Sequence, residues 1–454
     1  MKCTLHNLGC KVNSYETEAM RQLLEAAGYE IVEFGSETAD VYIINTCTVT
    51  NIADRKSRQM LHKAKKDNPN AVVVAAGCYV QEAGEKLLAD EAVDIIVGNN
   101  RKGQIVEVLE EYFKGRNIDN SFIDINKTRE YENLEINASL AHTRAYIKIQ
   151  DGCNQFCTYC IIPFARGRVR SRKIEDIIDE VRKLAESGCH EIVVTGIHLS
   201  SYGLDFDNTE YNAQPVPNAE RLLQVLEAIA AVYGIDRIRL GSLEPRIITD
   251  TFLERLSAIP QICPHFHLSL QSGCDETLKR MNRRYDTEEF REGVEKIRRY
   301  FDKPAITTDV IVGFPGETDE EFAITRKYLE EINFFEMHVF KYSRRKGTIA
   351  DRMENQIPDS VKSERSDVLI ELDEELSRAY RESFTGSAEV VLVEEYVECD
   401  GIKYAVGHTK RYVKVYISLD CAQAQDIKIN AEIPVIITGI FGKDSVISKV
   451  AIAN

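Results

Sequence analysis

Short apolar runs alternate with amphipathic helical stretches along most of this chain, a pattern typical of parallel β-sheets joined by crossover helices. In the first quarter of the chain, amphipathic stretches at 16–27 and 54–66 separate the apolar runs. The sequence therefore predicts an α/β domain with a doubly wound parallel sheet over residues 1–115. Its strands are expected at 3–8, 41–45, 72–76 and 95–97.

The same rhythm returns in the middle of the chain after a polar stretch, 116–142, that lacks strong periodicity and is expected to be a linker. Six strand and helix units follow, too few for a closed eight-stranded barrel, so residues 143–371 are predicted to form a partial (βα)6 barrel. Its strands are expected at 145–150, 191–195, 237–241, 265–271, 306–311 and 337–342.

The pattern changes near residue 372, where a charged helical stretch gives way to β-rich runs separated by Gly, Asp and Asn. Several short strands at this spacing predict a small antiparallel β-barrel over 372–454. A chain of 454 residues is long enough for the three domains that these patterns indicate.

Composition restricts the compartment and the partners. The start, MKCTLHNLGC, lacks a basic region followed by a long apolar core, and no stretch approaches the ~18 apolar residues that span a bilayer. We therefore expect a cytoplasmic protein with no membrane contact. In a reducing compartment, twelve cysteines indicate metal ligation more than disulfides. The net charge of −16 argues against general nucleic-acid coating, although local basic clusters can still contact phosphates.

Three cysteines form a compact motif directly after the first strand of the predicted barrel. Cys153, Cys157 and Cys160 lie in CNQFCTYC with no fourth cysteine or histidine at finger spacing. Closed structural zinc and electron-transfer sites take four protein ligands, whereas three thiolates can hold three irons of a cubane cluster and leave the fourth open. A zinc site completed by a distant residue, or a run of buried cysteines, is the alternative.

A second set of three cysteines is spread over the first domain. Cys10, Cys47 and Cys78 each follow the end of a predicted strand. Carboxyl ends of parallel strands share one edge of a doubly wound sheet, so these thiols should converge into another site. Alternatively, each could be a small buried residue at a strand end.

Both cysteine sets resemble the radical S-adenosylmethionine (SAM) superfamily and, within it, the methylthiotransferases. The motifs that carry the resemblance are CNQFCTYC, LGCKVNSYE, NTC and GCY. In this family the open iron of a [4Fe-4S] cluster chelates SAM and cleaves it to a deoxyadenosyl radical. The resemblance implies that Cys153, Cys157 and Cys160 hold that cluster and that Cys10, Cys47 and Cys78 hold an auxiliary [4Fe-4S] cluster. The carboxy-terminal strands resemble the TRAM domain, an RNA-binding module.

Further residues near the strand ends are candidates for SAM or substrate contacts. The resemblance places the loop TGIHLSSYG at the methionine amino group, and alternation along a strand puts Ser269 and Gln271 on one face. A buried carboxylate is costly unless paired, so Asp309 is either a hydrogen-bonded core residue or a group near the substrate. For Tyr159, packing in the core is an equal alternative. For the loop residues, the alternative is a simple turn or hydrogen bonding in the core. The candidates are Tyr159, Thr195, Gly196, His198, Ser269, Gln271, Asp309 and Gly313.

A basic run, PFARGRVRSRK, follows the cysteine motif. Arginine forks bind phosphate oxygens in pairs, so this loop is predicted to contact an RNA backbone, with solvated surface charge as the alternative. The residues concerned are Arg166, Arg168, Arg170, Arg172 and Lys173.

The resemblance implies a methylthiotransferase that uses SAM, two clusters, an electron donor and a sulfur source. GCNQFCTYCIIPFARGRVRSR, GIHLSSYG and SLQSGCDETLKRMNRRY look most like the group that acts on threonylcarbamoyladenosine, so we expect methylthiolation of carbon 2 of that nucleoside at tRNA position 37. An anticodon-loop base is unpaired and can be splayed into a pocket. Alternatives are isopentenyladenosine tRNA, a ribosomal-protein aspartate, or a non-catalytic iron-sulfur protein that binds RNA or senses redox state.

Overall fold

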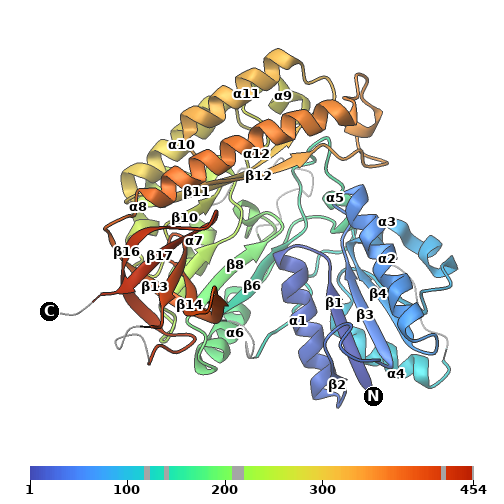
Figure 1. Cartoon of the computed structure of the whole chain (residues 1–454). Coiled ribbons are helices and arrows are strands. Elements are labelled where there is room, and N and C mark those ends of the chain that lie inside the picture. Colours follow the sequence, from blue (N-terminus) through green and yellow to red (C-terminus); the bar gives the residue numbers. More distant parts are fainter. Residues whose placement is uncertain (117–122, 138–142, 207–218, 421–425, 452–454) are drawn as a thin grey trace.

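The computed structural model describes residues 1–116, 123–137, 143–206, 219–420 and 426–451 (Figure 1). Its first domain contains a five-stranded, wholly parallel sheet in the order β2-β1-β3-β4-β5. The four predicted strands are confirmed, and β2 is a short edge strand that the sequence pattern did not indicate. The strands are β1 (Lys2–Asn7), β2 (Glu30–Ile31), β3 (Val41–Thr46), β4 (Val72–Gly77) and β5 (Ile95–Val97).

Helices cover both faces of this sheet, which confirms the doubly wound arrangement. One face packs its core against α1 (Lys11–Ala26) and α4 (Ile105–Phe113). The other packs against α2 (Asn51–Asp67) and α3 (Cys78–Ala83). The β3 and β4 strands are buried along their whole length, as expected for central strands of a parallel sheet.

The second domain is the predicted incomplete barrel. Two parallel sheets, β6-β8-β9 and β10-β11-β12, are joined by isolated parallel bridges from Ile238 to Ile262 and from Leu243 to Leu268. A short strand, β7 (Arg170–Ser171), adds to β6 in the antiparallel sense. The six parallel strands are β6 (Arg144–Asp151), β8 (Glu191–Gly196), β9 (Arg237–Leu240), β10 (His265–His267), β11 (Ala305–Val312) and β12 (Glu336–Lys341).

Helices surround the outside of this partial barrel and bury one extensive apolar core with its strands. The β10 strand ends four residues earlier than predicted, and Gln271, at the predicted end, has a positive φ of 73°, which is not a strand conformation. The surrounding helices are α6 (Ile174–Glu186), α7 (Ala219–Ala230), α8 (Asp250–Ser257), α9 (Asp275–Arg280), α10 (Thr287–Tyr300) and α11 (Asp319–Ile332). The short α5 (Ile162–Ala165) follows the cysteine motif and lies against α3 of the first domain.

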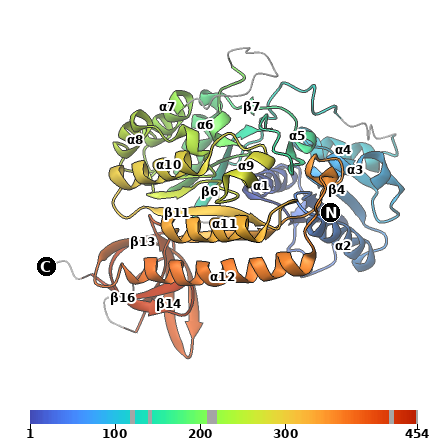
Figure 2. The same cartoon turned by 90° about the horizontal axis from the view of Figure 1, so that it is seen from above.

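The long helix α12 (Asp359–Glu382) runs beside β12 and leads to the carboxy-terminal strands (Figure 2). Leu369 and Leu372 on this helix belong to the same apolar core, so the boundary predicted at 372 falls inside an element of the barrel domain.

Five strands after α12 close into a barrel in the order β13-β14-β15-β17-β16. Most neighbours are antiparallel, as predicted, but β15 and β17 run parallel, so the expectation of a wholly antiparallel barrel was wrong in this pair. Each strand of this barrel runs opposite to the strand before it in the sequence or to its partner in the sheet, so β15 and β17, two strands apart in the sequence, run in the same direction. They are neighbours in the barrel and therefore pair in parallel. The strands are β13 (Ala388–Cys399), β14 (Ile402–Thr409), β15 (Lys414–Ser418), β16 (Glu432–Phe441) and β17 (Ser445–Val450).

The amino-terminal domain and the carboxy-terminal barrel lie on opposite sides of the partial barrel (Figure 1). Arg144 and Arg237, the first residues of β6 and β9, form ion pairs with Glu394 and Glu432 of the carboxy-terminal barrel. The carboxy-terminal barrel therefore packs at the amino ends of the parallel strands.

The predicted linker has no helix or strand in its described part, 123–137. It is nevertheless packed rather than loose, because Ile125, Leu134 and Ile136 are buried. Tyr15 of α1 donates a hydrogen bond to the Leu134 carbonyl, and the Ile136 N–H donates to Glu180 of α6. The linker thus ties the first domain to the barrel.

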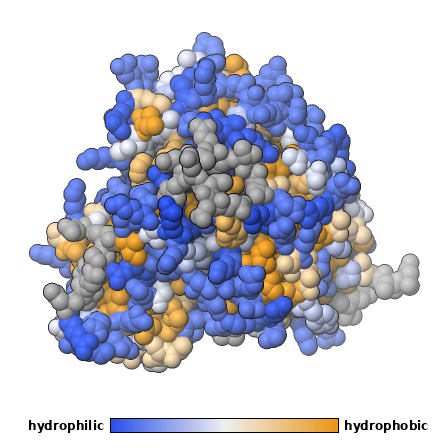
Figure 3. Space-filling view, turned by 180° about the vertical axis from the view of Figure 1, so that it is seen from behind, coloured by the Kyte–Doolittle hydropathy of each residue, from blue (hydrophilic) through white to orange (hydrophobic). Residues whose placement is uncertain are grey.

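Polar residues dominate the face seen in Figure 3, and hydrophobic residues occur there in small groups. Among the described helices, none combines the length and the apolar character needed to cross a membrane.

Candidate functional site

Cys10, Cys47 and Cys78 follow β1, β3 and β4, and the structure brings them to one edge of the first sheet. Cys10 is the N-cap of α1 and Cys78 is the first residue of α3. The thiol of Cys47 interacts electrostatically with those of Cys10 and Cys78, as expected for neighbouring groups. The predicted convergence is therefore confirmed.

Gly77 explains how the chain turns into the third of these cysteines. It has a φ of 95°, and a Cβ at this position would lie 2.5 Å from Asn45 Oδ1 and 2.6 Å from the Thr46 carbonyl oxygen. Only glycine fits without displacing the neighbouring strand. The glycine thus permits close approach to β3.

Two hydrogen-bond donors approach the sulfur of Cys78 in this site. Arg166 Nε lies 3.2 Å from Cys78 Sγ, and Asn99 Nδ2 lies 3.7 Å from the same sulfur. Burial raises the pKa of Cys47 to about 11 and also raises the pKa of Cys10, so bare thiolates are disfavoured there. A bound metal cluster stabilises thiolates in such an environment, and donors to ligand sulfurs are part of iron-sulfur sites.

Cys153, Cys157 and Cys160 lie on the loop after β6, at the carboxyl end of the barrel. The backbone N–H of Thr158 donates to the Met281 carbonyl at 3.0 Å, and Asn282 Nδ2 donates to the Phe156 carbonyl at 3.0 Å. Phe156 itself has a φ of 51°, a strained value held by these contacts. The loop is therefore fixed by the segment that follows α9.

This second set also receives donors. Arg283 Nη1 lies 3.2 Å from Cys157 Sγ, and the N–H of Gln155 lies 3.5 Å from Cys153 Sγ. Burial raises the pKa of Cys160 to about 12 and that of Cys153 further. As at the first site, these residues fit a bound group that stabilises the thiolates.

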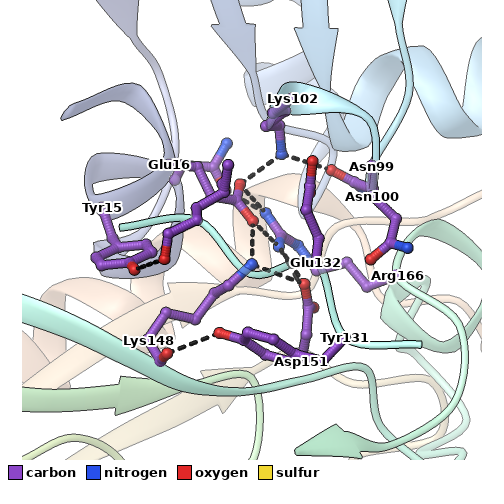
Figure 4. A network of polar contacts seen from close by, with 12 residues as sticks. Tyr15, Glu16, Asn99, Asn100, Lys102, Tyr131, Glu132, Lys148, Asp151 and Arg166 are labelled. Carbon is purple, nitrogen blue, oxygen red and sulfur yellow. Dashed lines mark hydrogen bonds and ion pairs between the residues drawn. The ribbon is translucent and has the colours of Figure 1, made fainter. Parts of the chain in front are cut away.

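A buried network of charges joins the first domain to the partial barrel (Figure 4). Glu16 of α1 pairs with Lys102 at 2.5 Å, Lys148 at 3.0 Å and Arg166 at 2.7 Å. Asp151 adds pairs with Lys148 and Arg166, each at 3.2 Å. These side chains are at most 4% exposed. Because Arg166 also contacts Cys78, the network holds the first cysteine set against the barrel.

The same geometry corrects the prediction that the basic run forms an RNA-contacting loop. Arg166, Arg170 and Arg172 are buried, at no more than 1% exposure. Arg170 donates to the carbonyls of Arg166 and Arg168, and Arg172 pairs with Glu180. Buried carboxylates and carbonyls bind these guanidinium groups, and Glu16, the partner of Arg166, comes from a distant part of the chain. The remaining two residues of the prediction differ, since Arg168 is half-buried and Lys173 is exposed.

A cavity of about 190 Å³ lies between the two cysteine loops. Val49 and Thr50, just after Cys47, line one side of it. Tyr159, directly before Cys160, lines the other side. The barrel wall of the cavity consists of Gln271, Asp309, Ile311 and residues 340–343.

Three of the predicted contact residues, Tyr159, Gln271 and Asp309, thus meet at this cavity. Gln271 is buried with a φ of 73°, and its N–H donates to the Asp309 carbonyl at 2.9 Å. Strained backbone of this kind persists where the surrounding structure over-determines it, often at functional sites. Asp309 Oδ2 lies 3.2 Å from His267 Nε2; burial would raise the pKa of this carboxyl, but the His267 contact holds it below its usual range.

The other predicted residues lie at strand ends with identifiable partners. Thr195 and Gly196 end β8, and the His198 ring contacts Ser201 Oγ at 2.7 Å and Glu244 Oε2 at 3.2 Å. The Ser269 carbonyl accepts hydrogen bonds from Arg283 and Tyr285.

The backbone and packing at Gly313, another of the predicted contact residues, require a glycine. Its φ is 69°, and a Cβ there would lie 2.3 Å from Cγ of Lys362 on α12. The position therefore needs glycine for its turn and for close packing against that helix.

Sequence reasoning missed the charged groups that shape both sites: Glu16, Lys148, Asp151, Glu244 and Arg283. A signal existed for Lys148 and Asp151, since both interrupt or end the otherwise apolar strand AYIKIQD. A lysine at such a place needs a buried partner.

Comparison with known proteins agrees with this architecture. Residues 147–329 match the model of the Radical SAM superfamily, and residues 2–98 match that of Uncharacterized protein family UPF0004. The radical SAM methyltransferase TsrM from Kitasatospora setae, with cobalamin and a [4Fe-4S] cluster bound, has a similar fold, with a TM-score of 0.55, 15% identity and coverage of 77% of this chain and 73% of that one. The class is thus a radical SAM enzyme with an added cysteine-bearing α/β domain.

Two curated relatives are similar over almost their whole length. Threonylcarbamoyladenosine tRNA methylthiotransferase MtaB of Bacillus subtilis is 43% identical over 90% of this chain and 89% of its own. The tRNA-2-methylthio-N(6)-dimethylallyladenosine synthase of Aquifex aeolicus is 36% identical over 87% and 88%. The chain belongs to the methylthiotransferase family of radical SAM enzymes, and it uses SAM and [4Fe-4S] clusters.

Proposed function

We propose that this enzyme methylthiolates carbon 2 of N6-threonylcarbamoyladenosine at position 37 of tRNA. The observation that carries the proposal is the cavity between the two cysteine loops, with Val49 and Thr50 on one wall and Tyr159 on the other. A base placed there has both cysteine sets within reach. The relatives named as threonylcarbamoyladenosine enzymes, at 35–43% identity, support this substrate.

We assign the two clusters to the two cysteine sets. Cys153, Cys157 and Cys160 would hold the one that binds SAM, and Cys10, Cys47 and Cys78 the auxiliary one. When bound, these groups supply the radical that takes hydrogen from the base and the sulfur that replaces it. The chain's own part is to fix both loops, through Arg166 and Arg283, and to hold the base between them.

Residues at the carboxyl ends of the strands would position SAM and exclude water. Tyr159 packs edge-on against Phe314, with ring centroids 6.3 Å apart, and forms an apolar wall of the cavity. Thr195, Gly196, Ser269 and Gly313 would contribute backbone groups, and Gln271 an amide. His198 is held by Ser201 and Glu244, so its proposed role is to position that loop.

RNA contacts are proposed for Arg168 and Lys173 and for the carboxy-terminal barrel, which we interpret as TRAM-like. On that barrel, the rings of Tyr416 and Phe441 lie 4.5 Å apart, and Lys414 Nζ lies 5.4 Å from the Tyr416 centroid. Half-buried aromatic rings beside a cation are a common platform for unpaired bases. We further propose an electron donor, a sulfur source and a cytoplasmic location, where tRNA is available.

The test is mass spectrometry of nucleosides after anaerobic incubation of the reconstituted protein with SAM, reductant, sulfide and threonylcarbamoyladenosine tRNA. Isopentenyladenosine tRNA is run alongside. We expect a methylthio product on the first tRNA only. Product on the second alone would replace the substrate, and SAM cleavage without product on either would point to another target.

Variants separate the roles of the two cysteine sets. Cys47→Ala should retain SAM cleavage in part while losing product at least tenfold, because Cys47 belongs to the auxiliary set. Cys399→Ala, a partly exposed cysteine on β13, is the matched control and should behave as the wild type. Full product formation by Cys47→Ala would contradict the assignment.

A further inference from the structure

Lys11 is an unusual residue at the start of α1. It is the first residue of a sixteen-residue helix whose first turn contains no acidic residue. A cation at this end opposes the helix dipole, which favours anions there. Lys11 is exposed, and in the described part of the chain no hydrogen bond or ion pair reaches its ammonium group. Its position is therefore unfavourable unless an anion binds beside it.

The charges around Lys11 come from the inside of the partial barrel. Its ammonium interacts electrostatically with Asp309 of β11, and with Arg144 and Arg239. His338 of β12 interacts with it in turn. Lys11, which follows Cys10 in the sequence, is thus within electrostatic range of Asp309, a residue that lines the cavity between the cysteine loops.

Most of the other cations in this region are already balanced. Arg239 Nε lies 2.9 Å from Glu191 Oε1, and Arg144 Nε lies 3.3 Å from the same oxygen. Arg144 also pairs with Glu394. Among the described residues, none forms a hydrogen bond or ion pair with the Lys11 ammonium, which is therefore available to a ligand. Lys341, which lines the cavity, differs because its ammonium donates to Ser363 Oγ at 3.0 Å.

Asp309 is engaged by His267, and a third side chain, His338, stacks on that imidazole with ring centroids 5.8 Å apart. The ligand atoms of these three residues lie within 4.8 Å of one another, which is compatible with a single cation. The nearby positive charge of Lys11 raises the free energy of a cation at this place. The combination instead suits a ligand with an anionic group and neighbouring hydrogen-bonding groups.

We propose that Lys11 binds the carboxylate of the amino-acid substituent on the target adenosine, and that His338 and the His267–Asp309 pair bind its neighbouring polar groups. This inference rests on the proposed function. A threonylcarbamoyl group carries a carboxylate, a hydroxyl and a carbamoyl group, whereas a dimethylallyl group is uncharged and apolar. Lys11 would therefore select the modified base by charge.

The test measures binding of anticodon stem-loop RNAs by fluorescence anisotropy to the anaerobically reconstituted full chain. Three loops differ only at position 37: threonylcarbamoyladenosine, isopentenyladenosine and unmodified adenosine. Wild-type protein should bind the first most tightly. Lys11→Met should weaken binding of that loop by about tenfold or more, the loss expected for a charge-assisted hydrogen bond, and leave the other two unchanged.

Two further variants serve as controls. Lys11→Arg keeps the charge and should keep most of the preference. Lys66→Met removes an exposed lysine from the last turn of α2 and should change all three affinities equally or not at all. Iron content of every variant, measured by absorbance and chemical assay, confirms that the neighbouring Cys10 site is intact.

The outcomes distinguish this inference from the proposed function. If the wild type prefers the threonylcarbamoyladenosine loop and Lys11→Met keeps that preference, the role of Lys11 is refuted while the substrate stands. If the wild type shows no such preference, both are refuted. If Lys11→Met weakens all three loops equally, its charge attracts the RNA backbone and the proposed carboxylate contact is wrong.

Discussion

Glu16 is the residue whose loss should most weaken the joint between the two domains. It pairs with Lys102, Lys148 and Arg166, and all four side chains are at most 1% exposed. These cations lower the pKa of Glu16 well below its usual range, although burial alone would raise it. Glu16→Gln keeps the shape of the side chain and removes its charge. Asp151 is then the carboxylate left to compensate Lys148 and Arg166.

Breaking a buried ion pair by removing one partner costs about 3–5 kcal/mol, because the other charge stays buried without compensation. Three cations share Glu16, so we expect the upper half of that range, about 4 kcal/mol, or roughly a thousandfold in the equilibrium between closed and open interfaces. The loss should fall on the interface between α1 and β6, and through Arg166 on the Cys78 site.

The assay is urea denaturation of the anaerobic proteins, followed by circular dichroism and by retention of iron, with hydrogen exchange to locate the opened interface. Glu18→Gln is the matched control, since Glu18 lies on the same helix and pairs with Arg21 near the surface. Its loss should cost no more than about 1 kcal/mol. Equal midpoints for the two variants would refute the claim that this network holds the domains together.

Two other predictions concern charge. Burial would raise the pKa of Glu191, but Arg239 and Arg144 lower it to about 2. The Glu191 carboxylate therefore stabilises the folded protein above about pH 4.5, and this stabilisation is lost as the pH falls toward 2. Wild-type stability should drop by about 2 kcal/mol more than that of Glu191→Gln between pH 7 and pH 3 in urea titrations, and parallel curves would contradict this. Arg283→Gln removes the donor to Cys157 Sγ and should lower the reduction potential of the cluster there by about 60 mV. Redox titration followed by electron paramagnetic resonance measures this potential. An unchanged potential would show that the Arg283 contact does not tune the cluster.

Strand positions and cysteine placement were predictable because both depend on local pattern. All ten strands expected in the first two domains are present, since buried parallel strands read as short apolar runs. Cys10, Cys47 and Cys78 could be placed together because parallel strands that share a sheet end at one edge. The parallel pairing of β15 and β17 could not be predicted, because it depends on the path between strands and not on their composition.

The burial of arginines in the basic run could not be predicted from the local sequence. Five charges within eleven residues read as a solvent-facing or RNA-facing loop, yet Arg166 and Arg172 are buried against Glu16 and Glu180. One partner is 150 residues away in sequence. The sequence of a basic run gives the number of cations. It does not indicate which carboxylates elsewhere in the chain will pair with them.

By itself, the sequence determined the kinds of chemistry available to this protein: two sets of three thiols at the carboxyl ends of parallel strands, on an α/β scaffold. The tertiary structure decided which charges are buried where the two domains meet and which side chains line the cavity. It also left the Lys11 ammonium without a hydrogen bond or ion pair to any described residue, within electrostatic range of Asp309. The reason is physical. Strands and turns are fixed by contacts within a few residues, whereas the cost of burying a charge is settled only when segments far apart in the chain meet.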